Sequence, residues 1–237
     1  MDTPSDKKDS RIEWEKVYEQ GLQNNSFPWS DLVSLYHQYK SELSTKRTSI
    51  KVVEFGSGTC NNYPLFKSIG ADYCGIESSE TAVKESLRKF PELEGKLIKC
   101  SFHETPLEIS DFDYVIDRGS ITCNSSLYIR NLVSEIYSRL TPGGLFIGVD
   151  WFSDKHSEYL NGQEYFGDPL TKHDFPSGYF QNLGITHFTN EVDLRNGLKK
   201  FEILYLSEKT VDVAESIFTV KNRYAFWSFV ARRPNDF

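Results

Sequence analysis

Apolar residues recur along the chain in two alternating rhythms. Short apolar runs predict buried strands, and apolar residues spaced three or four positions apart predict helices between them. This alternation predicts a parallel sheet with helices on both faces. The predicted strands cover residues 50–55, 73–77, 96–100, 112–117 and 145–151. The helices between them cover residues 63–69, 79–90 and 127–140, and a Thr-Pro-Gly-Gly turn at 141–144 precedes the fifth strand.

The two ends of the chain extend this core. Residues 1–10 are polar without periodicity and are predicted to be a disordered tail. We expect one α/β domain over residues 11–237, a three-layer sandwich whose seven-stranded sheet is mostly parallel and ends in an antiparallel hairpin strand. The first predicted part is a helical cap at 11–49 with helices at 12–18 and 31–43, and the core follows at 50–151. The final segment at 190–237 has a predicted helix at 190–199 and strands at 201–207 and 224–232.

An inserted region is predicted at residues 152–189. Its first part, residues 152–184, holds several Gly, Pro and aromatic residues and shows no clean period. Long irregular insertions often act as binding lids, so we expect this region on the substrate side of the domain.

A glycine motif follows the first predicted strand. Glu54-Phe55-Gly56-Ser57-Gly58 lies where open α/β sheets bind ligands, and glycine allows a ligand to approach the backbone closely. Glu77 ends the next strand about 20 residues later, where an acidic side chain can accept hydrogen bonds from both hydroxyls of a ribose. Together these features predict an adenosine-containing cofactor.

Two details favour one such cofactor over another. A dinucleotide fingerprint needs a third glycine, and Asn61 occupies that position. The carboxylate of Glu54 would repel a pyrophosphate but suits a cationic ligand. A nicotinamide dinucleotide is therefore the second choice.

The motifs taken together resemble those of the class I S-adenosylmethionine-dependent methyltransferases, which have a Rossmann-like fold. The resemblance covers roughly residues 14–233. Its motifs are Val52-Val53-Glu54-Phe55-Gly56-Ser57-Gly58, Gly75-Ile76-Glu77, Phe112-Asp113-Tyr114-Val115-Ile116-Asp117-Arg118-Gly119-Ser120 and Leu140-Thr141-Pro142-Gly143-Gly144. It implies S-adenosyl-L-methionine as the cofactor and S-adenosyl-L-homocysteine as the product.

The resemblance also implies roles for individual residues. Gly56, Ser57 and Gly58 would face the methionine portion, Glu54 would hold its ammonium group, and Glu77 would bind the ribose. Adenine would lie between Ile76 or Ser78 and the loop of Ser101, Phe102 and His103. Asp117 would contact the methionine portion, and Arg118 would lie where cofactor and substrate meet. Trp14, Tyr18 and Trp29 resemble aromatic residues that fold over the cofactor in some small-molecule methyltransferases, where a ring face also attracts a sulfonium.

Charge and missing motifs narrow the acceptor. A net charge of -7 and a pI near 5.3 oppose nucleic-acid binding. No Asn-Pro-Pro-Tyr motif follows the fourth strand, so methylation of a DNA base or a glutamine is disfavoured. We expect a small-molecule acceptor, with no nucleic-acid or membrane partner, for a cytoplasmic monomer or homodimer. The four cysteines are far apart in sequence, and we expect no metal site.

The sequence does not identify a catalytic residue. Candidates for a base are Asp150, Asp154 and His156, which lie at the end of the fifth strand or just after it, although a base is needed only when the acceptor is protonated. Three functions stay open at this point: a small-molecule methyltransferase, a catalytically silent protein that binds S-adenosylmethionine, and a nicotinamide-dependent oxidoreductase.

Overall fold

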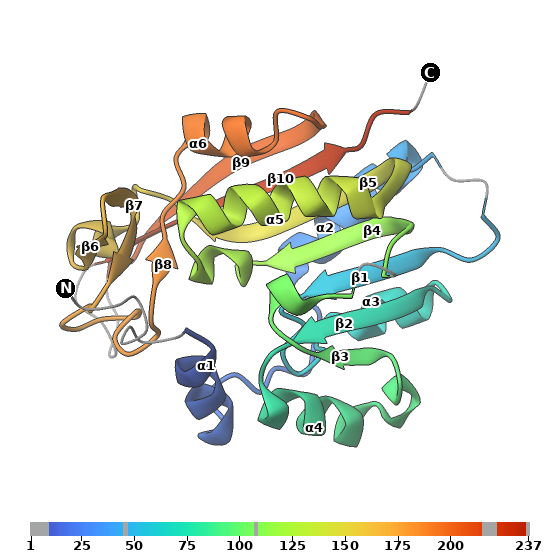
Figure 1. Cartoon of the computed structure of the whole chain (residues 1–237), viewed down its shortest axis with the longest axis horizontal. Helices are drawn as coiled ribbons and strands as arrows, with labels where there is room; N and C mark the ends of the chain where they lie inside the picture. The colour runs from blue at the N-terminus through green and yellow to red at the C-terminus, as the bar shows by residue number, and fades with distance from the viewer. Residues whose placement is uncertain (1–9, 45–46, 107–108, 215–221, 236–237) are drawn as a thin grey trace.

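A seven-stranded sheet forms the centre of the computed structural model, which describes residues 10–44, 47–106, 109–214 and 222–235 (Figure 1). The strand order is β3-β2-β1-β4-β5-β10-β9. Strands β1 to β5 run parallel, whereas β10 is antiparallel to both β5 and β9. The sheet strands are β1 (Lys51–Phe55), β2 (Asp72–Glu77), β3 (Leu97–Lys99), β4 (Phe112–Arg118), β5 (Leu140–Phe152), β9 (Glu202–Asp212) and β10 (Arg223–Arg232). The predicted fold class is thus confirmed.

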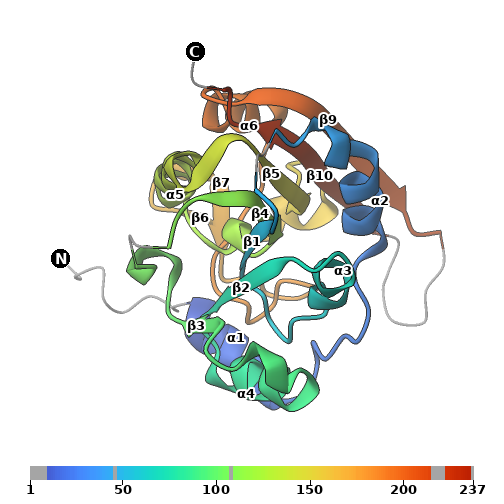
Figure 2. The same cartoon turned by 90° about the vertical axis from the view of Figure 1, so that its right-hand side faces the viewer.

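Helices cover both faces of this sheet, with α2 and α3 on one side and α5 on the other (Figure 2). The sheet has one hydrophobic core on each face, because successive residues of β1 point to opposite faces. Val52 packs in a cluster with Leu32 of α2, and Val53 packs in a second cluster with Ile136 of α5. The helices are α1 (Ser10–Glu19), α2 (Ser30–Tyr39), α3 (Tyr63–Ser68), α4 (Glu80–Lys89), α5 (Ser126–Arg139) and α6 (Glu191–Gly197), with short 3-10 turns η2 (Lys40–Glu42), η3 (Pro91–Leu93), η4 (Phe102–Glu104), η5 (Ile121–Cys123) and η6 (Ser157–Leu160).

The inserted region is more regular than its sequence predicts. It contains a separate antiparallel sheet of β6 (Gln163–Tyr165), β7 (Asp168–His173) and β8 (Thr186–His187). These strands are too short for a period of two to emerge from the surrounding residues. Buried His187 hydrogen-bonds Thr171 and Asp193, and Asp168 accepts hydrogen bonds from the main chain and hydroxyl of Ser126. These bonds attach the small sheet to α5 and α6.

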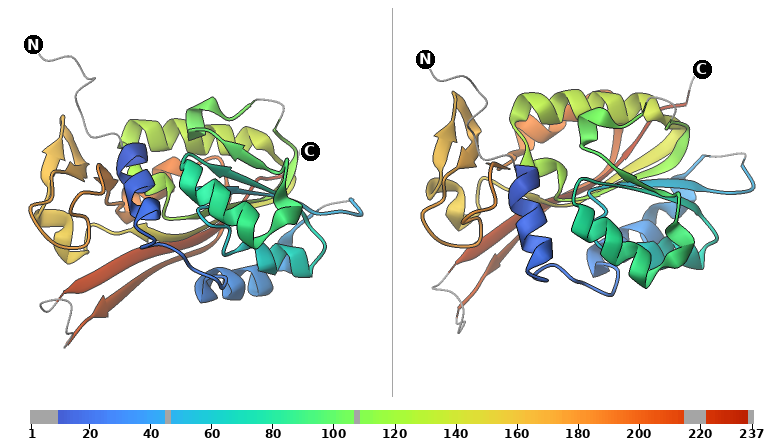
Figure 3. Two further views of the ribbon diagram at one scale, coloured as in Figure 1. Left: turned by 90° about the horizontal axis from the view of Figure 1, so that it is seen from below. Right: turned by 60° about the horizontal axis from the view of Figure 1, so that its bottom comes forward.

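Helix α1 connects the inserted region to the core. Residues 1–9 of the predicted tail lie outside the described residues, but Ser10, assigned to that tail, is the first residue of the helix. The hydroxyl of Ser10 accepts a hydrogen bond from the main chain of Ile185, and the carboxylate of Glu15 accepts two from Thr81 at the start of α4. Figure 3 shows α1 lying between the small sheet and α4.

Two further boundaries differ from the prediction. Strand β5 begins at Leu140, so the segment predicted as a turn at 141–144 is part of the strand, with Gly143 at φ 78°. Strands β9 and β10 form the predicted hairpin and pair as far as Asp212 and Arg223. In the described part of the chain, no helix has the length and apolar content to cross a membrane.

Candidate functional site

A cavity of about 760 Å³ opens at the carboxyl ends of β1, β2, β4 and β5, a size and place typical of ligand sites in open α/β folds. Twelve of the fifteen residues named above for the cofactor line it. These are Trp14, Tyr18, Trp29, Glu54, Gly56, Ser57, Gly58, Glu77, Ser78, Ser101, Phe102 and Arg118. Ile76 and Asp117 do not line the cavity, and the side chain of His103 lies outside the described part of the structure.

The glycine loop after β1 is held in a conformation that favours glycine. Gly56 and Gly58 have φ values of 64° and 54°. A Cβ on Gly56 would overlap the side chain of Ser120, and one on Gly58 would lie 2.5 Å from the hydroxyl of Tyr18. Both glycines are therefore required by contacts within the protein, in addition to any ligand.

Glu77 fastens this loop to the start of α4. Its side chain is 6% exposed, and its two oxygens accept hydrogen bonds from the main-chain N–H groups of Gly58 and Ser79 at 2.9 and 2.8 Å. Burial raises the pKa of Glu77, while these hydrogen bonds oppose the rise. The Ser78 hydroxyl also donates to Oε1 at 3.5 Å. A carboxylate has about four lone-pair sites, so Oε2 can still accept a hydrogen bond from a ligand hydroxyl.

Glu54 is a second buried carboxylate at the cavity wall. It is 2% exposed and accepts hydrogen bonds from Asn62 Nδ2 at 2.7 Å and the Tyr73 hydroxyl at 2.6 Å. Burial raises the pKa of Glu54 to about 7. A buried carboxylate such as Glu54 needs hydrogen-bond donors around it. Only the fold identifies Asn62 and Tyr73 as these donors.

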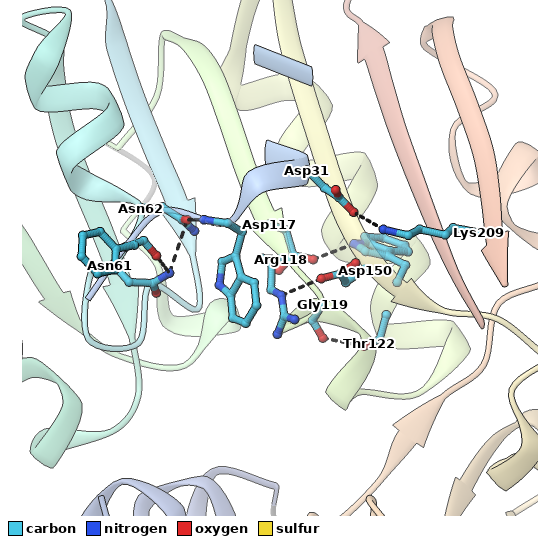
Figure 4. A network of polar contacts seen from close by, with 12 residues as sticks. Asp31, Asn61, Asn62, Asp117, Arg118, Gly119, Thr122, Asp150 and Lys209 are labelled. Carbon is cyan, nitrogen blue, oxygen red and sulfur yellow. Dashed lines mark hydrogen bonds and ion pairs between the residues drawn. The ribbon is translucent and has the colours of Figure 1, made fainter. Parts of the chain in front are cut away.

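Next to Glu54, three side chains form a second wall of the cavity. The guanidinium of Arg118 lies 3.7 Å from the centre of the Trp29 ring, and its Nε donates to Asp150 at 2.9 Å (Figure 4). The main-chain N–H of Trp29 donates to Asn62 Oδ1, which connects this wall to Glu54. Because Arg118 and Asp150 pair, the wall carries little net charge.

Asp117 has a different position from the one predicted. Strand alternation places it on the same side of β4 as Val115, toward α5 and away from the cavity. Its oxygens accept hydrogen bonds from Ser120, from the main chain of Ile121 and from Trp151 Nε1. Burial raises the pKa of Asp117 to about 6. Asp117 therefore supports the loop after β4, and we do not assign it a contact with the cofactor.

Aromatic residues close the cavity on the side of α1 and η4. Trp14 donates a hydrogen bond from Nε1 to Cys123 Sγ at 3.3 Å, and its ring lies 6.3 Å from that of Tyr18. Phe102 packs against Phe55 with the ring centres 5.5 Å apart. Two predicted aromatic residues, Trp14 and Phe102, thus line the cavity.

The remaining wall comes from the end of β5, from residues beyond it and from β10. We call it the acceptor compartment, and its members were not predicted from sequence except for His156. One signal was available, since Tyr224 and Phe226 alternate along a strand and must share a face. The acceptor compartment consists of Phe152, His156, Tyr179, Phe180, Tyr224 and Phe226.

The three candidates for a base differ in position. Asp154 does not line the cavity, and burial and nearby Glu208 raise the pKa of its carboxyl. Asp150 lines the cavity but is paired with Arg118. His156 lines it and is 2% exposed, and burial lowers its pKa to about 4, so that the ring is neutral at physiological pH.

Comparison with known proteins agrees with this geometry. A family model described as a methyltransferase domain matches residues 52–144. No curated protein sequence matches the chain significantly.

Solved structures resemble the fold over almost its whole length. The 1,6-didemethyltoxoflavin-N1-methyltransferase of Burkholderia thailandensis, with bound 1,6-didemethyltoxoflavin and S-adenosylhomocysteine, has a TM-score of 0.67 at 14% identity and covers 99% of this chain and 94% of its own. A methyltransferase of Methanosarcina mazei has a TM-score of 0.64 at 16% identity, with 85% and 98% covered. The magnesium protoporphyrin IX methyltransferase of Synechocystis, with bound S-adenosylmethionine, has a TM-score of 0.53 at 14% identity, with 95% and 82% covered.

At these identities the structural likeness establishes the fold. Residues 52–144 match a methyltransferase domain, and the chain has the Rossmann-like fold of solved S-adenosylmethionine-dependent methyltransferases.

Proposed function

We propose that the chain binds S-adenosylmethionine in this cavity and transfers its methyl group to a small-molecule acceptor. The observation that carries the proposal is the pair of buried carboxylates, Glu54 and Glu77, on the two sides of the glycine loop. Glu77 can accept the ribose hydroxyls, and Glu54 can hold the ammonium group of the methionine portion. The structures with bound S-adenosylmethionine and S-adenosylhomocysteine support this assignment by their fold.

The reaction needs alignment more than acid or base groups. A lone pair on the acceptor forms a bond to the methyl carbon while the bond from carbon to sulfur breaks, and the sulfonium becomes a neutral thioether. If the attacking atom carries a proton, that proton leaves to solvent or to a base. Positioning of the two reactants can therefore supply much of the rate acceleration.

The aromatic walls contribute to this alignment. Trp14 and Trp29 line the cavity near the glycine loop, where a ring face attracts a sulfonium cation. Because methyl transfer removes this charge, the attraction weakens on going to the product.

Glu54 argues against a nicotinamide cofactor, whereas Glu77 suits the ribose of either cofactor. A pyrophosphate beside an ionised Glu54 would meet an acidic side chain at the loop that should hold it. A silent binding protein stays the alternative to an enzyme, and a transfer assay decides between them.

Calorimetry with S-adenosylmethionine, S-adenosylhomocysteine and NAD tests the cofactor. We expect the first two to bind and NAD not to bind. Glu77→Gln should weaken S-adenosylhomocysteine binding about tenfold or more, because hydrogen bonds to the ribose are lost. Glu80→Gln removes an exposed carboxylate three residues away and serves as the matched control.

Failure of both adenosyl ligands to bind would refute the proposed function, and preferential binding of NAD would favour the oxidoreductase. Incubation with methyl-labelled S-adenosylmethionine and a panel of small acceptors then tests transfer. Binding without transfer to any acceptor of the panel would favour a silent binding protein.

A further inference from the structure

Arg118 keeps unused hydrogen-bond donors at the cavity. Its Nε donates to Asp150 Oδ2 at 2.9 Å, and among the described residues its two terminal amino groups have no hydrogen-bond partner. The side chain is 30% exposed and lines the cavity, and Figure 4 shows it extending beyond the end of β4. The ring of Trp29 supports one face of the guanidinium. The terminal edge of the guanidinium is thus oriented and open to a ligand.

The charges around the cavity favour an anion at this edge. Charged residues of both signs line the cavity, namely Arg11, Arg118, Glu54, Glu77, Glu104 and Asp150. Each of the four carboxylates already accepts hydrogen bonds from the protein. Asp150 engages only Nε of Arg118, so an anion at the terminal amino groups would lie closer to the guanidinium than to Asp150. A carboxylate fits best, because a guanidinium edge can donate two parallel hydrogen bonds to its two oxygens.

Tyr179 provides a second donor near Arg118. Its side chain is 46% exposed and lines the cavity, and within the described part of the chain its hydroxyl has no hydrogen-bond partner. Burial raises the pKa of this hydroxyl, and the charges of Arg118 and Asp150 act on it with opposite signs, so the hydroxyl lies near both. The main-chain N–H of Tyr179 donates to the buried carboxylate of Glu158 at 2.7 Å. Tyr179 is therefore held where its protonated hydroxyl can donate to an anion bound by Arg118.

The acceptor compartment beside these donors offers aromatic surface. The rings of Tyr224 and Phe226 make an angle of 4° with centres 6.4 Å apart, and Phe152 lies 5.9 Å from Phe226. All three side chains are half-buried and line the cavity. Besides burial, the Tyr224 hydroxyl raises the pKa of Tyr179, so this aromatic surface adjoins the donors. Aromatic guests gain from edge and face contacts with such rings in addition to the area that they bury.

The methionine portion of the cofactor has donors of its own. Under the proposed function Glu54 holds its ammonium group. Gln23 and Asn25 also line the cavity, and the main chain of Asn25 accepts a hydrogen bond from Thr59, which follows the glycine loop. The side-chain amides of Gln23 and Asn25 can donate to the methionine carboxylate. This arrangement leaves the terminal edge of Arg118 to the acceptor.

We propose that the acceptor is an aromatic molecule with a carboxylate group, which binds the terminal amino groups of Arg118 and the hydroxyl of Tyr179 while its ring lies against the acceptor compartment. The inference rests on the proposed function and adds the class of substrate. Arg118 and Tyr179 orient the acceptor and select for its charge, and the aromatic residues select for its ring.

Ligand binding to the protein saturated with S-adenosylhomocysteine tests this inference. Naphthoate and naphthamide have nearly the same shape, but only naphthoate is charged, and decahydronaphthoate is charged without being aromatic. We expect naphthoate to bind about tenfold more tightly than naphthamide, because hydrogen bonds between two charged groups are strong. It should bind about threefold more tightly than decahydronaphthoate. Calorimetry measures all three.

Two variants assign this preference to its residues. Arg118→Gln removes the charged donors, so naphthoate and naphthamide should bind it about equally. Tyr179→Phe keeps the ring and removes one donor, and should weaken naphthoate about threefold, more than it weakens naphthamide. Arg130→Gln changes an exposed arginine of α5 that does not line the cavity, and should keep the preference of the parent protein.

The Arg118→Gln variant also distinguishes the two sources of a carboxylate. We expect it to weaken the binding of naphthoate more than the binding of S-adenosylhomocysteine. The reverse order would mean that Arg118 holds the methionine carboxylate, and the inference would then be wrong.

The possible failures are distinct. Absence of S-adenosylhomocysteine binding by the parent protein would contradict the proposed function and this inference with it. Normal S-adenosylhomocysteine binding with no preference for naphthoate over naphthamide, or with decahydronaphthoate bound as tightly as naphthoate, would overturn the inference alone. A preference for naphthoate that survives in Arg118→Gln would also overturn it, since the carboxylate would then bind elsewhere.

Discussion

Glu54 combines near-complete burial with a role that needs negative charge. Its pKa of about 7 lies well above the usual 4.5, because burial disfavours the ionised form despite hydrogen bonds from Asn62 and Tyr73. The folded state therefore favours the protonated carboxyl. The resulting contribution to stability is fully present below pH 4.5 and is lost as the pH rises to about 7. A cationic ligand would reverse this preference.

Glu54→Gln should therefore separate stability from binding. Glutamine can accept from Asn62 and donate to the Tyr73 hydroxyl, so the variant should be more stable than the parent protein at pH 8, by up to about 3 kcal/mol. S-adenosylhomocysteine should bind the parent protein more tightly at pH 7.5 than at pH 6, and bind the variant weakly at both. Denaturant unfolding and calorimetry measure the two effects. Tight binding by the variant with an unchanged pH profile would refute the role of Glu54.

The glycine motif and Asp117 show which residue contacts the sequence predicts and which it does not. The glycine motif was correctly identified as a loop at the cavity, but its glycines are required by Ser120 and Tyr18 as well. A valine at Gly56 would overlap Ser120, so its effect would not report on a ligand. Asp117 lies at the end of a strand where sequence predicts a ligand contact, and strand alternation turns it toward α5. These contacts join residues far apart in sequence and cannot be inferred from spacing.

Helix α1 is the element whose position depends most on a few polar contacts. It contains no fully buried residue, and Glu15 attaches it to Thr81 at the first turn of α4. Trp14 and Tyr18 of this helix line the cavity, so the same contact also fixes one wall of the site.

Glu15→Ala should loosen this wall without removing a residue from it. We expect S-adenosylhomocysteine to dissociate about five- to tenfold faster, because hydrogen bonds worth roughly 1 kcal/mol or more hold the helix in place. Stopped-flow fluorescence can measure the rate. Glu19→Ala, at an exposed position of the same helix, should leave it unchanged. Equal rates in both variants and the parent protein would show that α1 does not restrain the ligand.

The elements that were predicted well are those with a strong apolar period. Strands β1, β2 and β4 and helix α5 fall close to their predicted positions because each buries several apolar side chains. The small sheet of β6, β7 and β8 escaped prediction because its contacts are mainly polar and distant in sequence, as between Asp168 and Ser126.

At the scale of the whole molecule, the cavity joins segments from nearly the full chain. Its lining begins at Ser10 and ends at Phe226. A ligand bound there stabilises many segments at once.

S-adenosylhomocysteine at 100 times its dissociation constant should raise stability by about 2.7 kcal/mol and the unfolding midpoint by about 5–10 °C. Thermal unfolding followed by circular dichroism measures this shift. NAD at the same concentration is the control and should produce no shift. A midpoint that does not respond to S-adenosylhomocysteine would argue against binding in the native state.

The fold class was predictable because strand and helix order leaves few arrangements of a parallel sheet. The cofactor side followed from short motifs within β1 to β5. The acceptor compartment could not be assembled in advance, because its walls come from the end of β5, from His156 just before η6, from the loop around Tyr179 and from β10. Their meeting depends on how the inserted region packs.

Because β10 lies beside β5, residues from the last part of the chain line the same cavity as the glycine loop. The two sides of the cavity therefore come from separate stretches of sequence, which matters for engineering. The matched methyltransferase domain ends at residue 144, whereas every member of the acceptor compartment lies after residue 151. Under the proposed function, acceptor preference can be varied through the inserted region and the terminal hairpin while the segment that carries Glu54 and Glu77 is kept. A library restricted to these later segments should then change the acceptor and leave S-adenosylhomocysteine binding as it is in the parent protein.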